Sequence, residues 1–197
     1  MVDEKLVIEN PERITQLLSE AGYGEHSILV YPDLNTFREV YTHEVKARLQ
    51  NNDIVALLPH YETLSSIKIN LRELDIDIAA LQKEKRLLIT DSAEVFFTNV
   101  GFSAFAKGLE DLAKRGNRNG TFIFAEMGPF FHRNQIQELL KWENSIPTKN
   151  EMNCSLVCCY HEKDLQRLSE EQKKMLCNHH FTDLHVKNVE DSNTFRS

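Results

Sequence analysis

The sequence contains no long apolar run, and this absence removes several classes of protein. A helix that crosses a membrane needs about 20 consecutive, mostly apolar residues, and no stretch of that length occurs. The chain opens with MVDEK, in which D, E and K are charged. This start lacks the apolar core of a secretory signal, so we expect no signal peptide. These features together predict a soluble, cytoplasmic protein.

An excess of positive charge is also missing. Lys and Arg total 23 against 30 Asp and Glu, which gives a net charge of −7 at pH 7. Phosphate contacts dominate affinity for nucleic acid, and basic segments draw proteins to anionic membranes. The one dense basic cluster, from Lys114 to Arg118, is typical of a helix end, where the helix dipole favours cations. We therefore expect no direct nucleic-acid partner and no membrane partner.

Cysteine is scarce and confined to one part of the chain. All four cysteines lie between Cys154 and Cys177, whereas a secreted disulfide scaffold would spread them out. Histidines in the same third make the residue types suitable for zinc, but no C-x2-C pair is present. Neighbours such as Cys158 and Cys159 face opposite sides of a strand. We assign no metal ligand and no cofactor, and a metal-dependent enzyme built on this segment stays as an alternative.

Short apolar runs alternate with amphipathic helices along the chain, which is typical of a parallel sheet. The predicted strands are Ser27–Tyr31, Asp53–Leu58, Arg86–Thr90, Thr121–Ala125 and Cys154–Tyr160, with Asp75–Ile78 as a further edge strand. Helices are predicted over 11–21, from Asp33 or Asn35 to Gln50, and over 61–74, 93–115 with a break near Gly101, and 133–145. Ser169 to Gln172 forms a capping box that opens the last helix.

This alternation predicts a three-layer α/β fold with a mostly parallel sheet and helices on both faces. The apolar content of the chain, 41%, is sufficient for a single hydrophobic core. We expect a helical segment over residues 1–24 to pack on a single domain over residues 25–188. The polar tail over residues 189–197 is expected to be disordered.

The first strand–helix turn lacks the glycines and the lysine of a phosphate-binding loop. Such a loop wraps phosphates with backbone N–H groups and adds Lys and Ser or Thr. The turn from Tyr31 to Thr36 reads YPDLNT, and its Asp33 would repel phosphate. ATP hydrolysis of the P-loop type is therefore not expected, and no dinucleotide fingerprint is present.

The other strand ends offer carboxylates and aromatic side chains. Ligands of parallel sheets bind at the carboxyl ends of the strands, so these positions are candidates. Asp91 follows the third strand, either as a metal-binding carboxylate or as a helix N-cap. Glu126 ends the fourth strand, either as a cleft carboxylate or general base, or as a structural acceptor for backbone amides. The candidate ligand-binding residues are Asp33, Asp91, Glu126, Phe130, Glu143 and Tyr160, and no catalytic residue is assigned.

Several short motifs occur together in one order along the chain. They are the strand HSILVY at residues 26–31, the strand ending in Glu126 and Met127, LLKWE at 139–143, CCY at 158–160 and CNHH at 177–180. In this order and spacing, over about residues 25–181, the chain resembles the MEDS domain family, the methanogen/methylotroph, DcmR sensory domain. The resemblance implies a fold similar to RecA and KaiC without the Walker A phosphate loop. It also implies a sensory role in signalling or transcription regulation, with small hydrocarbon-like or halogenated metabolites as ligands.

Three hypotheses for function follow. The first is a non-catalytic sensory domain that binds a small, apolar metabolite or a signalling protein. The second is a degenerate nucleotide-binding domain that regulates a RecA-like or KaiC-like ATPase, and titration with ATP and magnesium separates it from the first. The third is the metal-dependent enzyme, which metal analysis tests. A homodimer is an arrangement that signalling domains use, but no feature of the sequence selects it.

Overall fold

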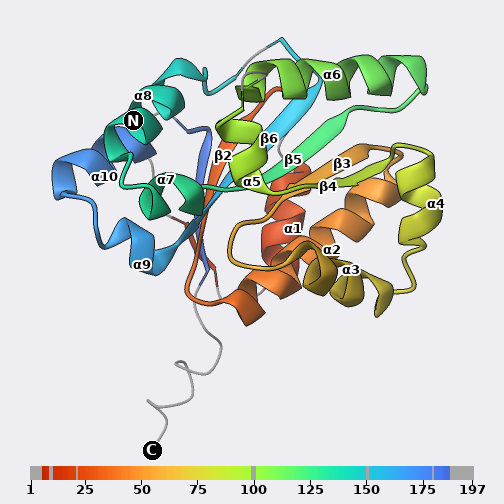
Figure 1. Ribbon diagram of the computed structural model, residues 1–197, viewed down its shortest axis with the longest axis horizontal. Helices are drawn as coiled ribbons and strands as arrows, with labels where there is room; N and C mark the ends of the chain where they lie inside the picture. Colours follow the sequence, from red (N-terminus) through yellow and green to blue (C-terminus); the bar gives the residue numbers. More distant parts are fainter. Residues whose placement is uncertain are drawn as a thin grey trace, which may run out of the picture.

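The computed structural model of the chain describes residues 6–8, 11–20, 22–98, 101–149, 151–178 and 180–186. At its centre lies a seven-stranded sheet with the strand order β1-β7-β2-β6-β5-β3-β4 (Figure 1). The strands are β1 (Leu6–Ile8), β2 (His26–Tyr31), β3 (Ile54–Leu58), β4 (Leu87–Ile89), β5 (Thr121–Glu126), β6 (Cys154–His161) and β7 (Thr182–Val186). Every pairing between neighbouring strands of this sheet is parallel. The parallel sheet predicted from the apolar strands is therefore confirmed.

The segments between the strands are helical, as parallel strands require. Within the described residues the helices are α1 (Pro11–Glu20), α2 (Leu34–Gln50), α3 (Leu64–Arg72), α4 (Ile78–Lys83), α5 (Ser92–Phe96), α6 (Gly101–Arg115), α7 (Gly128–His132), α8 (Ile136–Ser145), α9 (Glu162–Leu165) and α10 (Glu170–Cys177). None of them is both long and apolar enough to span a membrane.

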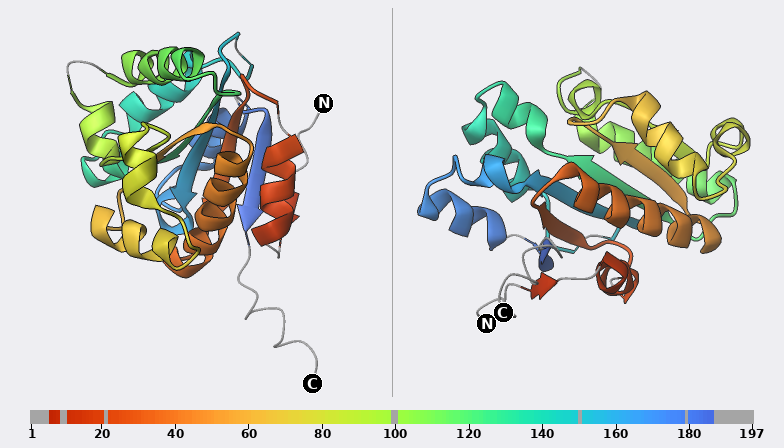
Figure 2. Two further views of the ribbon diagram at one scale, coloured as in Figure 1. Left: turned by 90° about the vertical axis from the view of Figure 1, so that its right-hand side faces the viewer. Right: turned by 90° about the horizontal axis from the view of Figure 1, so that it is seen from below.

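The two faces of the sheet bury separate apolar clusters. Side chains alternate along a strand, so Ile28 of β2 joins one cluster and Leu29 joins the other. Side chains of the helices from α5 onward pack into the first cluster, whereas those of α1 to α4 pack into the second. The left view of Figure 2 places α1 and α6 on opposite sides of the sheet. The predicted three-layer α/β architecture is confirmed.

The segment Asp75–Ile78 is not an edge strand, so that prediction is wrong. Asp75 lies in a turn after α3 with a φ of 59°, in the left-handed region. Asp77 is the N-cap of α4, and its side chain accepts a hydrogen bond from the Ala80 amide. Asp side chains favour turns and helix caps, and here this preference outweighs the alternating pattern of the segment.

Other elements agree with the sequence patterns except at their ends. The capping box at Ser169 and Gln172 is present, and the break before Gly101 separates α5 from α6. Helices α3 and α8 begin three residues later than predicted, and β1, α7 and β7 carry no clear pattern in the sequence. The polar tail over residues 189–197 lies outside the described residues.

Candidate functional site

Glu126, at the end of β5, is a buried acceptor that joins neighbouring segments. Its carboxylate accepts hydrogen bonds from the Tyr31 hydroxyl on β2 and from the backbone amides of His60 (2.5 Å) and Tyr61 (3.0 Å) after β3. Burial raises the pKa of Glu126, and the backbone and tyrosine hydrogen bonds oppose that rise. This geometry has the features of the structural acceptor, the second of the two roles that the sequence left open. Ligand binding by Glu126 remains a prediction.

Asp33 and Asp91 are both helix N-caps. The Asp33 carboxylate accepts hydrogen bonds from the amides of Asn35 and Thr36, each at 2.9 Å, at the start of α2. Asp91 accepts one from the amide of Ala93 at 2.7 Å, at the start of α5. A phosphate at a helix N-terminus needs such N–H groups. At α2 the carboxylate of Asp33 holds two of them, so the helix start is ill-suited to phosphate.

Phe130 packs inside the apolar cluster beneath α8. Its ring lies 5.2 Å from that of Phe96, 4.9 Å from Phe97 and 6.4 Å from Trp142, measured between centroids. The side chain is 4% exposed, so Phe130 contributes to the core in this conformation. Ligand binding by Phe130 stays a prediction.

Glu143 and Tyr160 lie together in a second buried polar group. We name the set His26, Glu143, Cys158 and His180 the buried quartet. One ligand atom from each member lies within 4.8 Å of one from every other member. The Nε2 atoms of His26 and His180 each lie 3.2 Å from Glu143 Oε2, and His26 Nε2 lies 3.1 Å from Cys158 Sγ.

The strands and helices explain why these side chains meet. Cys158 is the register partner of Ile28, two residues after His26 on the neighbouring strand β2. Along β6, Cys158 faces the first cluster and Cys159 the second, as the alternation predicts. Glu143 enters from α8, and His180 follows α10. Four separate elements of the first face therefore supply one side chain each.

The buried quartet has an outer layer of hydrogen bonds. Tyr160 donates its hydroxyl hydrogen to Glu143 Oε1, and His180 Nδ1 lies 2.8 Å from the carbonyl oxygen of Leu176. Burial raises the pKa of Glu143, but hydrogen bonds from His180 and His26 outweigh it and hold that pKa well below its usual range. Burial and the Glu143 charge raise the pKa values of the Cys158 thiol and the Tyr160 hydroxyl. Glu143 is therefore ionised within this group.

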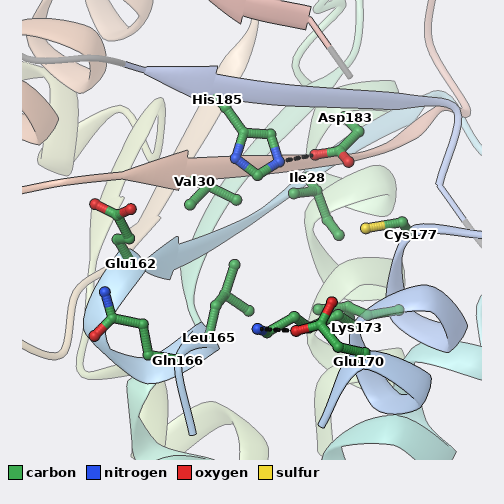
Figure 3. A pocket seen from close by; sticks show the side chains of 11 residues that line it. Ile28, Val30, Glu162, Leu165, Gln166, Glu170, Lys173, Cys177, Asp183 and His185 are labelled. Atoms are coloured by element: carbon green, nitrogen blue, oxygen red, sulfur yellow. Dashed lines mark hydrogen bonds and ion pairs between the residues drawn. The ribbon is translucent and has the colours of Figure 1, made fainter. Parts of the chain in front are cut away.

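A hollow of about 320 Å³ lies on the same face, between the sheet and helices α9 and α10 (Figure 3). Its apolar lining comes from four side chains, namely Ile28, Val30, Leu165 and Leu176. Its polar lining includes Cys177, the ion pair of Lys173 with Glu170 at 2.7 Å, and the contact of His185 Nε2 with Asp183 Oδ1 at 2.8 Å. We name this hollow the α9–α10 pocket.

The α9–α10 pocket lies along the face of β2 and β7, and one side of it reaches the carboxyl ends of the strands, where ligand sites of parallel sheets lie. Glu162 directly follows β6, and His185 lies near the carboxyl end of β7. Leu176 lines the pocket and also accepts the hydrogen bond of His180 through its carbonyl oxygen. A second hollow of about 230 Å³ lies beside Trp142, Phe102 and Met152. None of the six predicted ligand-binding residues lines either hollow.

Comparison with known proteins gives a family match and a similar solved structure. The family model of MEDS, the methanogen/methylotroph, DcmR sensory domain, matches residues 25–180. The chain belongs to the MEDS family. No curated protein matches it.

Among solved structures, the MEDS domain is similar to a KaiC-like protein from the hyperthermophilic archaeon Pyrococcus horikoshii. The two are 15% identical with a TM-score of 0.47, and the similar region covers 71% of this chain and 62% of that protein. The chain thus spans less than two thirds of the length of that protein. The resemblance to the MEDS family inferred from the short motifs is confirmed by the family match.

Three residues of the buried quartet, His26, Cys158 and His180, were not among the candidate site residues of this MEDS domain. His26 and His180 appear in the sequence only within family motifs, and nothing local marks them as neighbours. No fixed spacing in the sequence links a buried histidine at the start of a strand to another one that follows a helix. The signal that points to them is the order of the motifs, since each of four motifs supplies one member of the quartet.

Proposed function

We propose that this MEDS domain is a non-catalytic sensor that binds a small metabolite in the α9–α10 pocket. The observation that carries the proposal is the combination of an apolar lining with a few polar groups in one hollow of about 320 Å³. Ligand pockets have this composition, and the volume is at the small end of their range, about 300 to 1,000 Å³. The ligand class is therefore a small molecule with an apolar body and one hydrogen-bonding or weakly charged group.

The position of the pocket would also allow a bound ligand to change the surrounding helices. Its lining comes from β2, from β7 at the edge region of the sheet, and from the two short helices α9 and α10. Short helices with partly exposed side chains open at low free-energy cost, which suits a segment that changes on binding. A ligand in the pocket would contact Leu176 and Cys177 and so shift α10, whose outer surface is available to a signalling partner.

Two observations support a sensor over the other two hypotheses. The N–H groups at the start of α2 that a nucleotide phosphate would need are held by Asp33. Every polar side chain of the buried quartet is at most 5% exposed, whereas catalytic metal sites keep an open position for substrate. Regulation of an ATPase partner through nucleotide, and metal-dependent catalysis, are therefore less well supported.

A thermal-shift screen with small alcohols, amines, carboxylic acids and halogenated alkanes tests the proposal. A ligand at 100 times its Kd stabilises the folded state by about 2.7 kcal/mol. For a chain of this size that free energy corresponds to a rise in Tm of roughly 5 to 10 °C. ATP with magnesium is included in the same screen, and a rise with ATP alone would favour the nucleotide hypothesis.

A matched pair of variants on α10 locates the site. Cys177→Phe fills the α9–α10 pocket, whereas Met175→Phe places the same side chain at an exposed position on the same helix. The stabilisation by ligand is expected to be lost in Cys177→Phe and kept in Met175→Phe. If both variants keep it, the compound binds elsewhere, as in the hollow beside Trp142, and the proposed location is wrong.

A further inference from the structure

The buried quartet brings together the donor atoms that a transition metal prefers. Two imidazole nitrogens, one thiol sulfur and one carboxylate oxygen converge from β2, β6, α8 and the residue that follows α10 by three positions. We propose that His26, Glu143, Cys158 and His180 bind one divalent transition-metal ion of the zinc type. The proposal is independent of the ligand in the α9–α10 pocket.

The spacing of the donor atoms suits a tetrahedral ion. Bonds of about 2.0 to 2.3 Å from a zinc ion place neighbouring donors roughly 3.3 to 3.8 Å apart. The closest donor pairs of the quartet are 3.1 to 3.2 Å apart, and no pair of these atoms exceeds 4.8 Å. Side-chain shifts of less than about 1 Å would therefore open the group around an ion.

The charges of the quartet also balance around a divalent cation. A thiolate at Cys158 and the carboxylate of Glu143 supply two negative charges, and two neutral imidazoles add none. Binding of the ion releases the thiol proton of Cys158, so the occupied site is neutral overall. Neutrality matters here because His26, Glu143 and Cys158 are 0% exposed, and an uncompensated charge at such depth is costly.

The hydrogen bonds around the quartet are those that surround metal-binding histidines. His180 Nδ1 lies 2.8 Å from the Leu176 carbonyl, which can only accept, so Nδ1 carries the proton. The hydrogen bond from Nε2 to Glu143, 3.2 Å away, then needs a second proton on the His180 ring, and a metal cation between the two atoms would take the place of that proton. A backbone carbonyl on the second nitrogen is the usual support for a histidine ligand, and Tyr160 orients the carboxylate in the same way.

The donor set selects the class of ion. Thiolate and imidazole favour zinc and its neighbours, whereas magnesium and calcium take oxygen ligands. All four ligands come from the protein and are buried, which is the pattern of an ion that holds elements together. Such an ion would tie the start of β2 and the segment after α10 to the centre of the sheet.

Cobalt titration of the full chain tests the proposal. Co²⁺ replaces Zn²⁺ in tetrahedral sites, and a thiolate ligand gives it a near-ultraviolet charge-transfer band beside intense visible bands. The chain is treated with chelator, and Co²⁺ is added both to the folded protein and during refolding from urea. One equivalent per chain is expected to produce both sets of bands, and one equivalent of Zn²⁺ is expected to abolish them.

Two cysteine variants on β6 make the result specific. Cys158→Ser removes the proposed ligand, whereas Cys159→Ser changes an equally buried thiol on the opposite face of the sheet. The charge-transfer band is expected to disappear in Cys158→Ser and to persist in Cys159→Ser. If Cys158→Ser does not fold, zinc content of the wild-type chain and its Tm with and without Zn²⁺ decide the matter.

Several results would overturn the proposal. They are a wild-type chain that gives no tetrahedral bands under either protocol, bands that survive in Cys158→Ser, and bands that vanish in Cys159→Ser. Where Cys158→Ser does not fold, the proposal is also overturned if the wild-type chain contains no zinc and added Zn²⁺ does not change its Tm. In each of these cases the quartet is a hydrogen-bonded group without a metal ion.

Discussion

His26 and His180 lie against each other with ring centroids 4.2 Å apart, although one opens β2 and the other follows α10. Both Nε2 atoms lie 3.2 Å from the same Glu143 oxygen. This contact joins the first part of the MEDS domain to its last, because the family match runs from residue 25 to residue 180. The buried quartet therefore links the two ends of the matched domain.

Removal of the Glu143 carboxylate is expected to destabilise the fold strongly. Glu143→Ala leaves the hydroxyl of Tyr160 and the ring nitrogens of both histidines without their buried acceptor. Loss of one partner from a buried ionic group typically costs about 3 to 5 kcal/mol. Urea unfolding measures this loss, and Glu138→Ala at an exposed position of α8 serves as the control. Equal midpoints for the two variants would contradict the assigned role of Glu143.

The carboxylate of Glu126 is expected to be structural in the ligand-free protein. Glu126→Ala removes the acceptor for the Tyr31 hydroxyl and for two backbone amides. Each buried donor left without a partner costs about 1 to 3 kcal/mol, so a loss of about 3 kcal/mol or more is expected. Glu94→Ala on α5, at an exposed position, is the control. Unchanged stability of Glu126→Ala would instead favour a carboxylate that is available to a ligand.

Two glycines with different surroundings are expected to respond oppositely to alanine. A Cβ at Gly128 would overlap the rings of His60 and Tyr61, whose backbone amides bind Glu126, whereas a Cβ at Gly108 on α6 would meet open space. Overpacking costs typically about 1 to 3 kcal/mol, so Gly128→Ala is expected to lower the free energy of unfolding. Gly108→Ala is expected to raise it by roughly 0.5 to 1 kcal/mol, since alanine favours a helix interior. Denaturant melts of both variants check the two signs together.

Glu44 is expected to make the stability of the fold depend on pH. Burial raises its pKa from 4.5 to about 7, against the opposing effect of Arg48, while Asp53 adds to the rise. The folded state therefore binds a proton that the unfolded state releases between about pH 4.5 and 7. The contribution of Glu44 favours folding at low pH and is lost as the pH rises through 7.

Glu44→Gln tests this linkage. The free energy of unfolding of the wild type minus that of Glu44→Gln is expected to grow as the pH falls from 8 to 5. The growth is about 1.4 kcal/mol for each pKa unit of the shift that is titrated. Glu39→Gln, at an exposed position of the same helix, is expected to show no such trend. A difference that is constant with pH, or that grows toward pH 8, would contradict the raised pKa.

The fold was predictable where apolar periodicity is strong, and the site was not. Strands β2, β3, β5 and β6 are buried along almost their whole length, so their apolar runs are continuous in the sequence. β7 lies beside the edge strand β1 and has the sequence TDLHV, whose polar residues interrupt the apolar run that would identify a strand. The contact between His26 and His180 depends on strand register and on where α10 ends, and neither is encoded by local spacing. Glu143 and Tyr160 were identified as candidates, but as lining of an open cleft rather than as members of a buried group.

We propose that the α9–α10 pocket holds the ligand, and the reactivity of Cys177 provides the sharpest test of that location. Cys177 is the one partly exposed cysteine, whereas Cys154, Cys158 and Cys159 are buried. In the ligand-free protein, mass spectrometry after brief alkylation is expected to find Cys177 modified and the other three protected. A compound that raises Tm in the screen is expected to slow the alkylation of Cys177 in proportion to its occupancy. Unchanged alkylation of Cys177 at saturating ligand would contradict the proposed pocket.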